Sequence, residues 1–361
     1  MGRWPDFRSV PGENRCVQFP ADPPPPRKPT HGDAFAVPHR RPGRVIAAGI
    51  AAGLIAAGLI ASGLPASAPA AAASRPAQAA APSIPLRPAA SGRPRHIRAR
   101  GAEVMNAVTG QRLWSRNLNR RKPMGSITKV MTALVVIRAG HLEQRITITK
   151  AIPAYIRRHP DASSAGLRAG DVLTARQLLE AMLVPSGCDA ALALAKAYGP
   201  GRHAFVQKMN AAARQLGMTR THFSNFDGMP LPTEHSTYST PADLMILGRA
   251  AMQLAPFRRI VRQQSHALAR TAAHHAYYWL STNLLLGAYP GTVGIKTGST
   301  RAAGYCLLFE ATVGGTTLIG VVLHSSGSNP FTRFKAAARL LNWGFGTAVA
   351  LPRRPAAPIR D

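Results

Sequence analysis

The sequence has little cysteine, and this limits the kinds of site that it can build. Only three cysteines occur among the 361 residues, namely Cys16, Cys188 and Cys306. An odd number without C-x-x-C spacing excludes a disulfide framework and a cysteine-based zinc knuckle. His274 and His275 are adjacent, which is not the H-E-x-x-H spacing of a zinc protease helix. The sequence therefore predicts no metal site and no cofactor.

Acidic side chains are also scarce, with 15 Asp and Glu against 45 Lys and Arg and a formal net charge of +30. A field of this sign favours anionic partners, here an anionic membrane or an acidic wall polymer. The basic residues are scattered, and the sequence has no zinc finger, no RNP-like motif and no basic run with interleaved aromatic residues. Nucleic acid is therefore not an expected partner. The alternative is an Arg-rich composition without a particular partner.

One long run lacks any charge, from Val45 to Leu64, and it is long enough to cross a bilayer as a helix. Basic residues precede it, which places the N-terminus in the cytoplasm and the rest of the chain outside. Ala66-Ser67-Ala68 after the run resembles a signal-peptidase site. The run is therefore a removed signal peptide, which we slightly favour, or an uncleaved transmembrane anchor. Either alternative predicts an extracytoplasmic protein on the periplasmic or cell-wall side.

Composition divides the remaining chain into four parts. Residues 1–44 are rich in Pro and Arg and are predicted to be disordered. Residues 65–98 form a Pro/Ala linker, and residues 348–361 form a short basic and Pro-containing tail. Between them, residues 99–347 carry the strand and helix patterns and are predicted to be the folded domain.

Within the predicted domain, strand patterns lie at both ends and helix patterns lie between them. Residues 109–111 separate two alternating segments as a hairpin turn. Thr174 and Gln177 form a T-x-x-Q capping box, and Thr240 is an N-cap before a second helix. Three strand segments, GIKTGS, GYCLLFEATV and TTLIGVVLHS, precede a closing helix. This order predicts an α+β fold, with helices packed on an antiparallel sheet.

Ser126 and Lys129 stand at the head of the strongly apolar segment MGSITKVMTALVVI. A helix places residues i and i+3 on one face, with Cβ atoms about 5–6 Å apart, so the hydroxyl and the amine can meet. The apolar residues that follow predict a buried helix, and burial favours the uncharged amine. An uncharged lysine beside a serine is a general base beside a nucleophile. Taken alone, such a pair is more often a plain N-cap followed by a lysine that reaches solvent.

Two further motifs follow in order and point to the same chemistry. Ser186 lies in PSGCDAA between two helix patterns, and Lys296-Thr297-Gly298 lies on a strand pattern. The ordered set S-x-x-K, S-x-N and K-T-G is the signature of penicillin-binding proteins and class A β-lactamases. Cys188 occupies the third position of the second motif here. The ordered set predicts a serine enzyme that works through an acyl-enzyme.

Residues about 99–345 resemble the D-alanyl-D-alanine carboxypeptidases, the low-molecular-mass penicillin-binding proteins of serine peptidase family S11. The matching stretches are NAVTGQRLWSRNLNRRKPMGSITKVMTALV, GLRAGDVLTARQLLEAMLVPSGCDAALALA, LGMTRTHFSNFDG, YSTPADL, STNLLLGAYPGTVGIKTGSTRAAGYCL and LLNWGF. The resemblance implies a penicillin-binding/β-lactamase-like fold in which a helical subdomain carries the second motif. It also implies that the enzyme removes the terminal D-alanine of peptidoglycan stem peptides and that β-lactams inhibit it.

The resemblance implies catalytic roles for the residues of the first two motifs. Ser126 would be the nucleophile that forms the acyl ester, and Lys129 would accept its proton. Ser186 would relay that proton to the leaving D-alanine. The backbone N–H groups of Ser126 and Ser299 would form the oxyanion hole.

The third motif would bind the substrate. Lys296 would help to bind the substrate carboxylate and would act on Lys129 through like-charge proximity. Thr297 would donate a hydrogen bond to the same carboxylate. Gly298 would leave room for the substrate to lie along the strand edge. Arg301 is either a further carboxylate contact or, in the favoured interpretation, a solvated surface residue.

Cys188 is the one departure from the motif, because the family has asparagine at this position. A thiol donates and accepts hydrogen bonds more weakly than an amide, so we expect altered or reduced activity rather than none.

Two alternative functions use the same residues or explain the departure at Cys188. A D,D-endopeptidase would cut peptidoglycan cross-links with the same motifs, and a degenerate wall-binding module would have lost activity through Cys188.

A class A β-lactamase is the third alternative, and it requires a deacylating glutamate some tens of residues after the second motif. No Glu occurs between Ala181 and Thr233. The acyl-enzyme formed with a β-lactam should therefore persist, so the sequence predicts a target of β-lactams and not an enzyme that destroys them.

Overall fold

The computed structural model describes residues 92–351. The expected N-terminal segment 1–44, the apolar run Val45–Leu64, most of the expected linker and the end of the tail lie outside the described residues. The last residues of the expected linker already pack on the body, since Ile97 is buried and Trp343 Nε1 donates to the Gly92 carbonyl at 3.0 Å. Among residues 92–351, no helix combines the length and the apolar character that a membrane crossing requires.

A five-stranded antiparallel sheet forms the centre of the fold, with strand order β2-β1-β9-β8-β7. Its strands are β1 (Gly101–Asn106), β2 (Arg112–Arg116), β7 (Thr292–Thr300), β8 (Gly304–Val313) and β9 (Thr316–Leu323). The expected hairpin and the expected three-strand meander are both present, and β1 joins them by pairing with β9 in the register Ala102↔Val322. The third motif therefore lies on β7, an edge strand.

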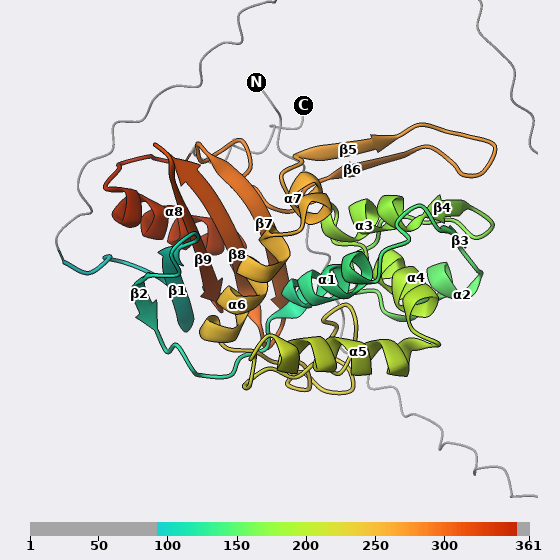
Figure 1. Ribbon diagram of the computed structural model, residues 1–361, viewed down its shortest axis with the longest axis horizontal. Helices are drawn as coiled ribbons and strands as arrows, with labels where there is room; N and C mark the ends of the chain where they lie inside the picture. Colours follow the sequence, from blue (N-terminus) through green and yellow to red (C-terminus); the bar gives the residue numbers. More distant parts are fainter. Residues whose placement is uncertain (1–91, 352–361) are drawn as a thin grey trace, which may run out of the picture. The chain divides into compact units, whose positions relative to one another are not determined.

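The two faces of this sheet bury separate clusters of apolar side chains, as the period of two along each strand requires. Helix α8 (Thr332–Phe345) covers one face, where Phe309 and Leu341 belong to one buried cluster. Helix α6 (Pro241–Met252) packs on the other face, where Leu308 and Leu244 belong to the second cluster (Figure 1). This arrangement confirms the predicted α+β fold with an antiparallel sheet flanked by helices.

A helical subdomain lies beside the sheet (Figure 1). It contains α1 (Lys129–Ala139), α2 (Ala151–Arg158), α3 (Ala175–Leu183), α4 (Cys188–Tyr198) and α5 (Arg202–Gln215). The remaining elements are α7 (Ala255–Val261) and two two-stranded sheets. One sheet pairs β3 (Arg145–Thr147) with β4 (Val172–Thr174), and the other is the hairpin of β5 (Ser265–Leu268) with β6 (Tyr277–Leu280). Ser186 lies between α3 and α4, so this subdomain carries the second motif as predicted.

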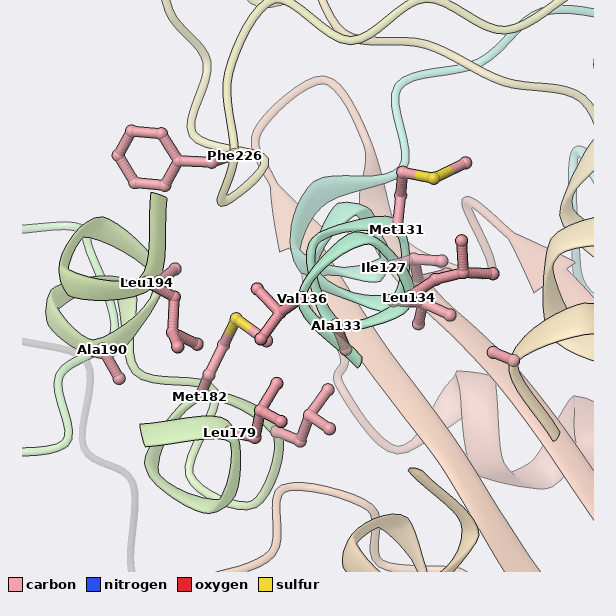
Figure 2. Packing of buried hydrophobic residues seen from close by; sticks show 14 of the residues in the cluster. Ile127, Met131, Ala133, Leu134, Val136, Leu179, Met182, Ala190, Leu194 and Phe226 are labelled. Atoms are coloured by element: carbon pink, nitrogen blue, oxygen red, sulfur yellow. The ribbon is translucent and has the colours of Figure 1, made fainter. Parts of the chain in front are cut away.

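Helix α1 is buried on nearly all sides, as its apolar sequence predicts. Figure 2 shows Val136 of α1 beside Leu179 and Met182 of α3, while Met131 points to the other side of α1, and all four side chains belong to one buried cluster. These side chains are at most a few per cent exposed. Burial of apolar surface on this scale stabilises the helix far more than its intrinsic propensity does, and it holds the end that begins with Lys129 in a defined place.

Local capping also sets the helix boundaries that the sequence predicts. The Thr174 hydroxyl accepts from the Gln177 N–H at 3.2 Å, and the Gln177 side chain accepts from the Thr174 N–H at 2.7 Å, which completes the capping box. At α6, the Thr240 hydroxyl accepts from the Asp243 N–H at 3.1 Å. These bonds satisfy donors that the first turn leaves without a partner.

Glu310 on the interior strand β8 makes stability depend on pH. It is only 7% exposed, and burial raises the pKa of its carboxyl to about 7 from an ordinary 4.5, against a smaller opposite effect of Arg258. The folded protein therefore binds this proton more tightly than the unfolded chain does, so the stability falls as pH rises from about 4.5 to 7. We expect Glu310→Gln to raise the free energy of unfolding at pH 8 by about 1–3 kcal/mol and to change it little at pH 4. Urea unfolding at both pH values checks this, and an equal effect at both would contradict it.

Candidate active site

Residues from all three motifs, far apart in the sequence, line one cleft between the helical subdomain and strand β7. The cleft has a volume of about 530 Å³ when the solvent space at its open mouth is included. Its lining includes Ser126, Ser186, Cys188, Thr297, Gly298 and Ser299. The two motif lysines lie beneath this surface, with Lys129 at 0% and Lys296 at 1% exposure.

Ser126 lies in a short 3₁₀ helix, η1 (Gly125–Thr128), which runs directly into α1. The sequence predicts one continuous helix here, whereas its first turn has the tighter 3₁₀ form. The Thr128 hydroxyl donates to the Gly125 carbonyl at 2.8 Å within this turn. Ser126 is half-buried while Ile127 and Thr128 beside it are buried, so the turn presents the serine to the cleft.

Lys129 meets Ser126 as the i, i+3 spacing predicts, with Nζ 2.8 Å from Oγ. The same nitrogen donates to the Asp227 carbonyl at 3.0 Å and to Cys188 Sγ at 3.2 Å. The amine therefore has three partners and does not reach solvent. The alternative of a lysine that extends into water is wrong for this chain.

The Asp227 carbonyl is held in place by its own buried side chain. Tyr155 on α2 donates its hydroxyl to Asp227 Oδ2 at 2.7 Å, and the Met229 N–H donates to Oδ1 at 3.1 Å. Asp227 is fully buried. No sequence pattern predicts this contact, because the group that accepts from Lys129 is a main-chain carbonyl, which any residue type could supply.

Cys188 occupies the first turn of α4 and faces Lys129. Burial raises the pKa of its thiol, so the group stays uncharged at neutral pH. Its N–H donates to the Ser163 carbonyl at 2.8 Å, which fixes the backbone next to the sulfur. The thiol thus holds a position from which it contacts Lys129, as the family's asparagine is expected to do, although with a weaker acceptor.

Ser186 reaches the cleft through an unusual backbone conformation. Its φ of 71° lies in the left-handed region, and its carbonyl accepts from the Ser163 hydroxyl at 2.6 Å. Asp189, at the start of α4, accepts from the Ala165 N–H at 2.9 Å and from the Ser164 hydroxyl at 2.8 Å. These hydrogen bonds therefore hold the α3–α4 turn against the loop before β4. They offset the free-energy cost of the left-handed backbone conformation at Ser186.

Three glycines let the nucleophile turn approach strand β7 and its neighbouring loop. A Cβ atom at Gly298 would lie 2.1 Å from the Met124 carbonyl oxygen, and one at Gly125 would lie 2.6 Å from the Ser299 nitrogen. A Cβ at Gly228 would lie 2.1 Å from the Gly125 oxygen. This packing is a second reason for glycine at position 298, while the expected room for the substrate stays a prediction. Gly298 is required because η1 packs directly on the strand.

Lys296 and Thr297 point to opposite sides of β7, as alternation along a strand requires. Burial first, and then the charges of Lys129 and Arg333, lower the pKa of Lys296 well below its ordinary value. Thr297 lines the cleft, and its hydroxyl lies 2.7 Å from the Thr282 hydroxyl. The two lysines repel each other in this enclosed place, which makes a second positive charge there costly.

Arg333 on α8 also lines the cleft, although no motif in the sequence includes this residue. Burial lowers the pKa of its guanidinium to about 10, and its Nε has no hydrogen-bond partner among the described residues. Its Nη1 lies 3.4 Å from the Gly298 carbonyl. It is one arginine among many and follows no motif, so only the docking of α8 reveals it. Arg301, by contrast, has a 93% exposed side chain 3.8 Å from Glu234 and does not line the cleft.

The cleft has one acidic lining residue, Asp161, and no glutamate among its lining residues within the described chain. A glutamate placed to deacylate a β-lactam ester is thus missing from the lining, in agreement with the sequence. No group of three or more His, Cys, Asp or Glu side chains among residues 92–351 could hold a metal ion.

Comparisons with known proteins place the chain in a family. The model of the peptidase S11 family, described as D-alanyl-D-alanine carboxypeptidase, matches residues 88–327. The D-alanyl-D-alanine carboxypeptidase of Streptomyces sp. (strain K15) is 41% identical over 262 residues, which cover 69% of this chain and 88% of that protein. The carboxypeptidase DacF of Bacillus subtilis (strain 168) is 30% identical over 68% of this chain, which spans only 62% of the length of DacF.

Solved structures agree with this placement. The crystal structure of the Streptomyces K15 DD-transpeptidase matches with a TM-score of 0.65 and 40% identity, over 69% of this chain and 98% of that chain. Solved variants of that enzyme replace a serine and a cysteine that lie two positions apart, which is the spacing of Ser186 and Cys188 here. The predicted resemblance is therefore confirmed: this chain belongs to the D-alanyl-D-alanine carboxypeptidase family, peptidase family S11.

Proposed function

We propose that this chain is a serine-type D-alanyl-D-alanine carboxypeptidase that removes the terminal D-alanine of peptidoglycan stem peptides through an acyl-enzyme. Members of its family act on such peptides and bind β-lactams. The observation that carries the proposal is the 2.8 Å contact between Lys129 Nζ and Ser126 Oγ inside a cleft that the other two motifs also line. A nucleophile with a base in hydrogen-bond reach is the minimum that this chemistry requires.

The hydrogen bonds of Lys129 suit a base. A neutral amine has two N–H bonds and one lone pair. The Asp227 carbonyl and the Cys188 sulfur lie in position to accept the two N–H bonds, which turns the lone pair toward Ser126 Oγ. We therefore assign Lys129 as the group that takes the proton when Ser126 Oγ attacks the carbonyl carbon between the two D-alanines.

The tetrahedral intermediate then collapses, and the C–N bond to the terminal D-alanine breaks. The Ser186 hydroxyl lies at the cleft surface and makes no hydrogen bond with a described residue. It is thus free to pass the proton from Lys129 to the leaving amine. Water later attacks the ester and regenerates Ser126.

Substrate charge would be met on the β7 side of the cleft. The Thr297 hydroxyl and the buried Arg333 guanidinium both line the cleft, and a carboxylate there would satisfy the cation with charge-assisted hydrogen bonds. Lys296 is 1% exposed and is not among the described residues that line the cleft. The backbone N–H groups of Ser126 and Ser299 are assigned to the oxyanion hole, since both residues line the same cleft.

The test of this function uses the full chain with a fluorescent penicillin and with purified muropeptides. Acylation at Ser126 and loss of one terminal D-alanine from pentapeptide monomers are expected. Splitting of cross-linked dimers without that loss would instead identify a D,D-endopeptidase. Failure to label with penicillin would point to the wall-binding module, and rapid turnover of a chromogenic cephalosporin would point to a β-lactamase.

Cys188 is assigned a supporting role, because the spacing of its motif also occurs in the Streptomyces enzyme and so is not a sign of decay in this chain. Cys188→Ala removes one of the three partners of Lys129 Nζ. We expect acylation by penicillin to slow roughly two- to tenfold, the effect of one ordinary hydrogen bond. Stopped-flow measurement checks this, with Cys188→Ser as the control that keeps an acceptor. A rate equal to that of the wild type would make the thiol contact irrelevant.

Family members work on the cell-wall side of the membrane. For this chain, we propose that Val45–Leu64 directs or anchors it there and that its basic surface favours an anionic membrane or wall polymer. Apart from Glu143 and Asp161, every Asp and Glu among residues 92–351 is at least partly buried, so the exposed charge is almost entirely positive. Release from cell envelopes by salt alone would support the role of charge. Release only by detergent would support the anchor.

A further inference from the structure

Asp161 is the only acidic residue that lines the cleft, and the proposed reaction does not use it. It lies in the loop after α2, two positions before Ser163. The side chain is exposed, and its carboxylate forms no hydrogen bond or ion pair with any of residues 92–351. An unpaired carboxylate thus faces a cleft that Arg333 also lines, with the side chains of Lys129 and Lys296 buried beneath its surface.

The loop that carries Asp161 is held firmly. The Ala162 N–H donates to the His159 carbonyl at 2.9 Å, and the Ser163 hydroxyl donates to the Ser186 carbonyl at 2.6 Å. The Cys188 N–H donates to the Ser163 carbonyl at 2.8 Å. Ser163 therefore makes hydrogen bonds with both Ser186 and Cys188 of the second motif. The carboxylate therefore has a fixed place on the wall of the cleft that the helical subdomain forms.

The surroundings make this carboxylate distinctive. Only one other acidic side chain of the described residues is exposed, Glu143, and it pairs with Arg176 at 2.5 Å. Every other Asp or Glu in that part of the chain is at least partly buried. On a protein of formal charge +30, Asp161 is thus the exposed acidic group that remains open to a cation, and it stands at the cleft.

We propose that Asp161 is a specificity-determining residue that binds a protonated primary amine of the peptide substrate. This inference rests on the proposed function. Stem peptides carry a diamino acid next to the D-alanines, and its side-chain amine is free before cross-linking. The amine at Asp161 belongs either to the peptide that is cleaved or to a second peptide that accepts the acyl group. In the second case the ammonium group first loses a proton to water, and the neutral amine then attacks the ester carbonyl. The amide bond forms, the ester bond to Ser126 Oγ breaks, and Ser126 Oγ regains the second proton of the amine. Both sources present the same ammonium group, and two assays distinguish them.

The first assay measures hydrolysis of a matched pair, Nα-acetyl-L-Lys-D-Ala-D-Ala with its side-chain amine either free or acetylated. The wild type is expected to prefer the free amine roughly fivefold in kcat/KM at low ionic strength, the upper end for an exposed ion pair. Asp161→Asn should bring this ratio close to one. Added salt should reduce the wild-type ratio in the same direction.

The second assay uses the acetylated peptide as donor and glycylglycine as the amine that competes with water for the acyl-enzyme. If the bound amine belongs to the acceptor, Asp161→Asn should lower the ratio of transfer product to hydrolysis product roughly fivefold. A fall in this ratio alone assigns the ammonium group to the acceptor, and a fall in the first ratio alone assigns it to the donor. Either result supports the proposal.

Glu143→Gln is the matched control, since it removes one exposed carboxylate that does not line the cleft. It should leave both ratios at their wild-type values. The proposal is overturned if Asp161→Asn changes neither ratio, including the case in which both peptides slow equally. A wild type that hydrolyses both peptides without preference and shows no transfer overturns this inference alone. A wild type that cleaves neither peptide and is not acylated by penicillin overturns the proposed function itself.

Discussion

Ser126→Ala is expected to abolish acylation by penicillin and to lower the hydrolysis of D-Ala-D-Ala peptides by about 10⁴-fold or more. The reason is that the acyl ester forms on Ser126 Oγ, and loss of a nucleophile removes the whole covalent route. Mass spectrometry of the intact protein after incubation with benzylpenicillin measures the adduct directly. Ser126 is half-buried and its hydroxyl makes a single hydrogen bond, to Lys129, so the variant should fold.

The outcome that contradicts this prediction is an adduct that survives in Ser126→Ala. Two other serines, Ser186 and Ser299, line the same cleft and are the nearest chemical alternatives. Peptide mapping of the acylated wild type would then identify the reacting residue. An unchanged thermal midpoint of the variant separates a lost nucleophile from a lost fold.

Lys129→Met is expected to slow acylation by penicillin about 10³-fold while it leaves the protein folded. Proton transfer by a positioned side chain contributes about 10²–10⁴-fold, and no other basic group is within hydrogen-bond distance of Ser126 Oγ among the described residues. Methionine is unbranched and apolar, so it fills most of the space that the lysine stem occupies. Rapid-quench measurement of the acylation rate checks the prediction.

Two further variants make the result for Lys129 decisive. Lys196→Met changes an exposed lysine on α4 and should leave the acylation rate unchanged. The double variant Ser126→Ala/Lys129→Met should be no slower in hydrolysis than Ser126→Ala alone, because a base without its nucleophile has nothing to activate. A rate for Lys129→Met within tenfold of the wild type would remove Lys129 as the base.

Much of the fold follows from local patterns in the sequence. The hairpin around residues 109–111, the capping box of Thr174 with Gln177 and the three-strand meander all depend on neighbours a few positions apart. The sequence does not predict the small sheets β3–β4 and β5–β6. Strands of three or four residues carry too little alternation to be recognised, and β3 pairs with β4 although α2 lies between them along the chain.

The 3₁₀ form of the nucleophile turn is another feature that local patterns do not reveal. Periodicity predicts that Ser126 and Lys129 share a face, and that holds because a 3₁₀ turn also brings residues i and i+3 together. The tighter turn arises where η1 packs against β7, at Gly125 and Gly298. The conformation is therefore set by a contact between segments far apart in the sequence.

Local sequence is enough to predict that a hydroxyl and an amine meet at the head of a buried helix, since i, i+3 geometry is a property of the local chain. The surroundings of that amine depend on the packing of distant segments. Its other partners, Cys188 Sγ and the Asp227 carbonyl, lie 59 and 98 residues away along the chain. Arg333 and Asp161 enter the same cleft from α8 and from the loop after α2. Such neighbours depend on how whole elements pack, and no pattern of a few residues encodes that packing.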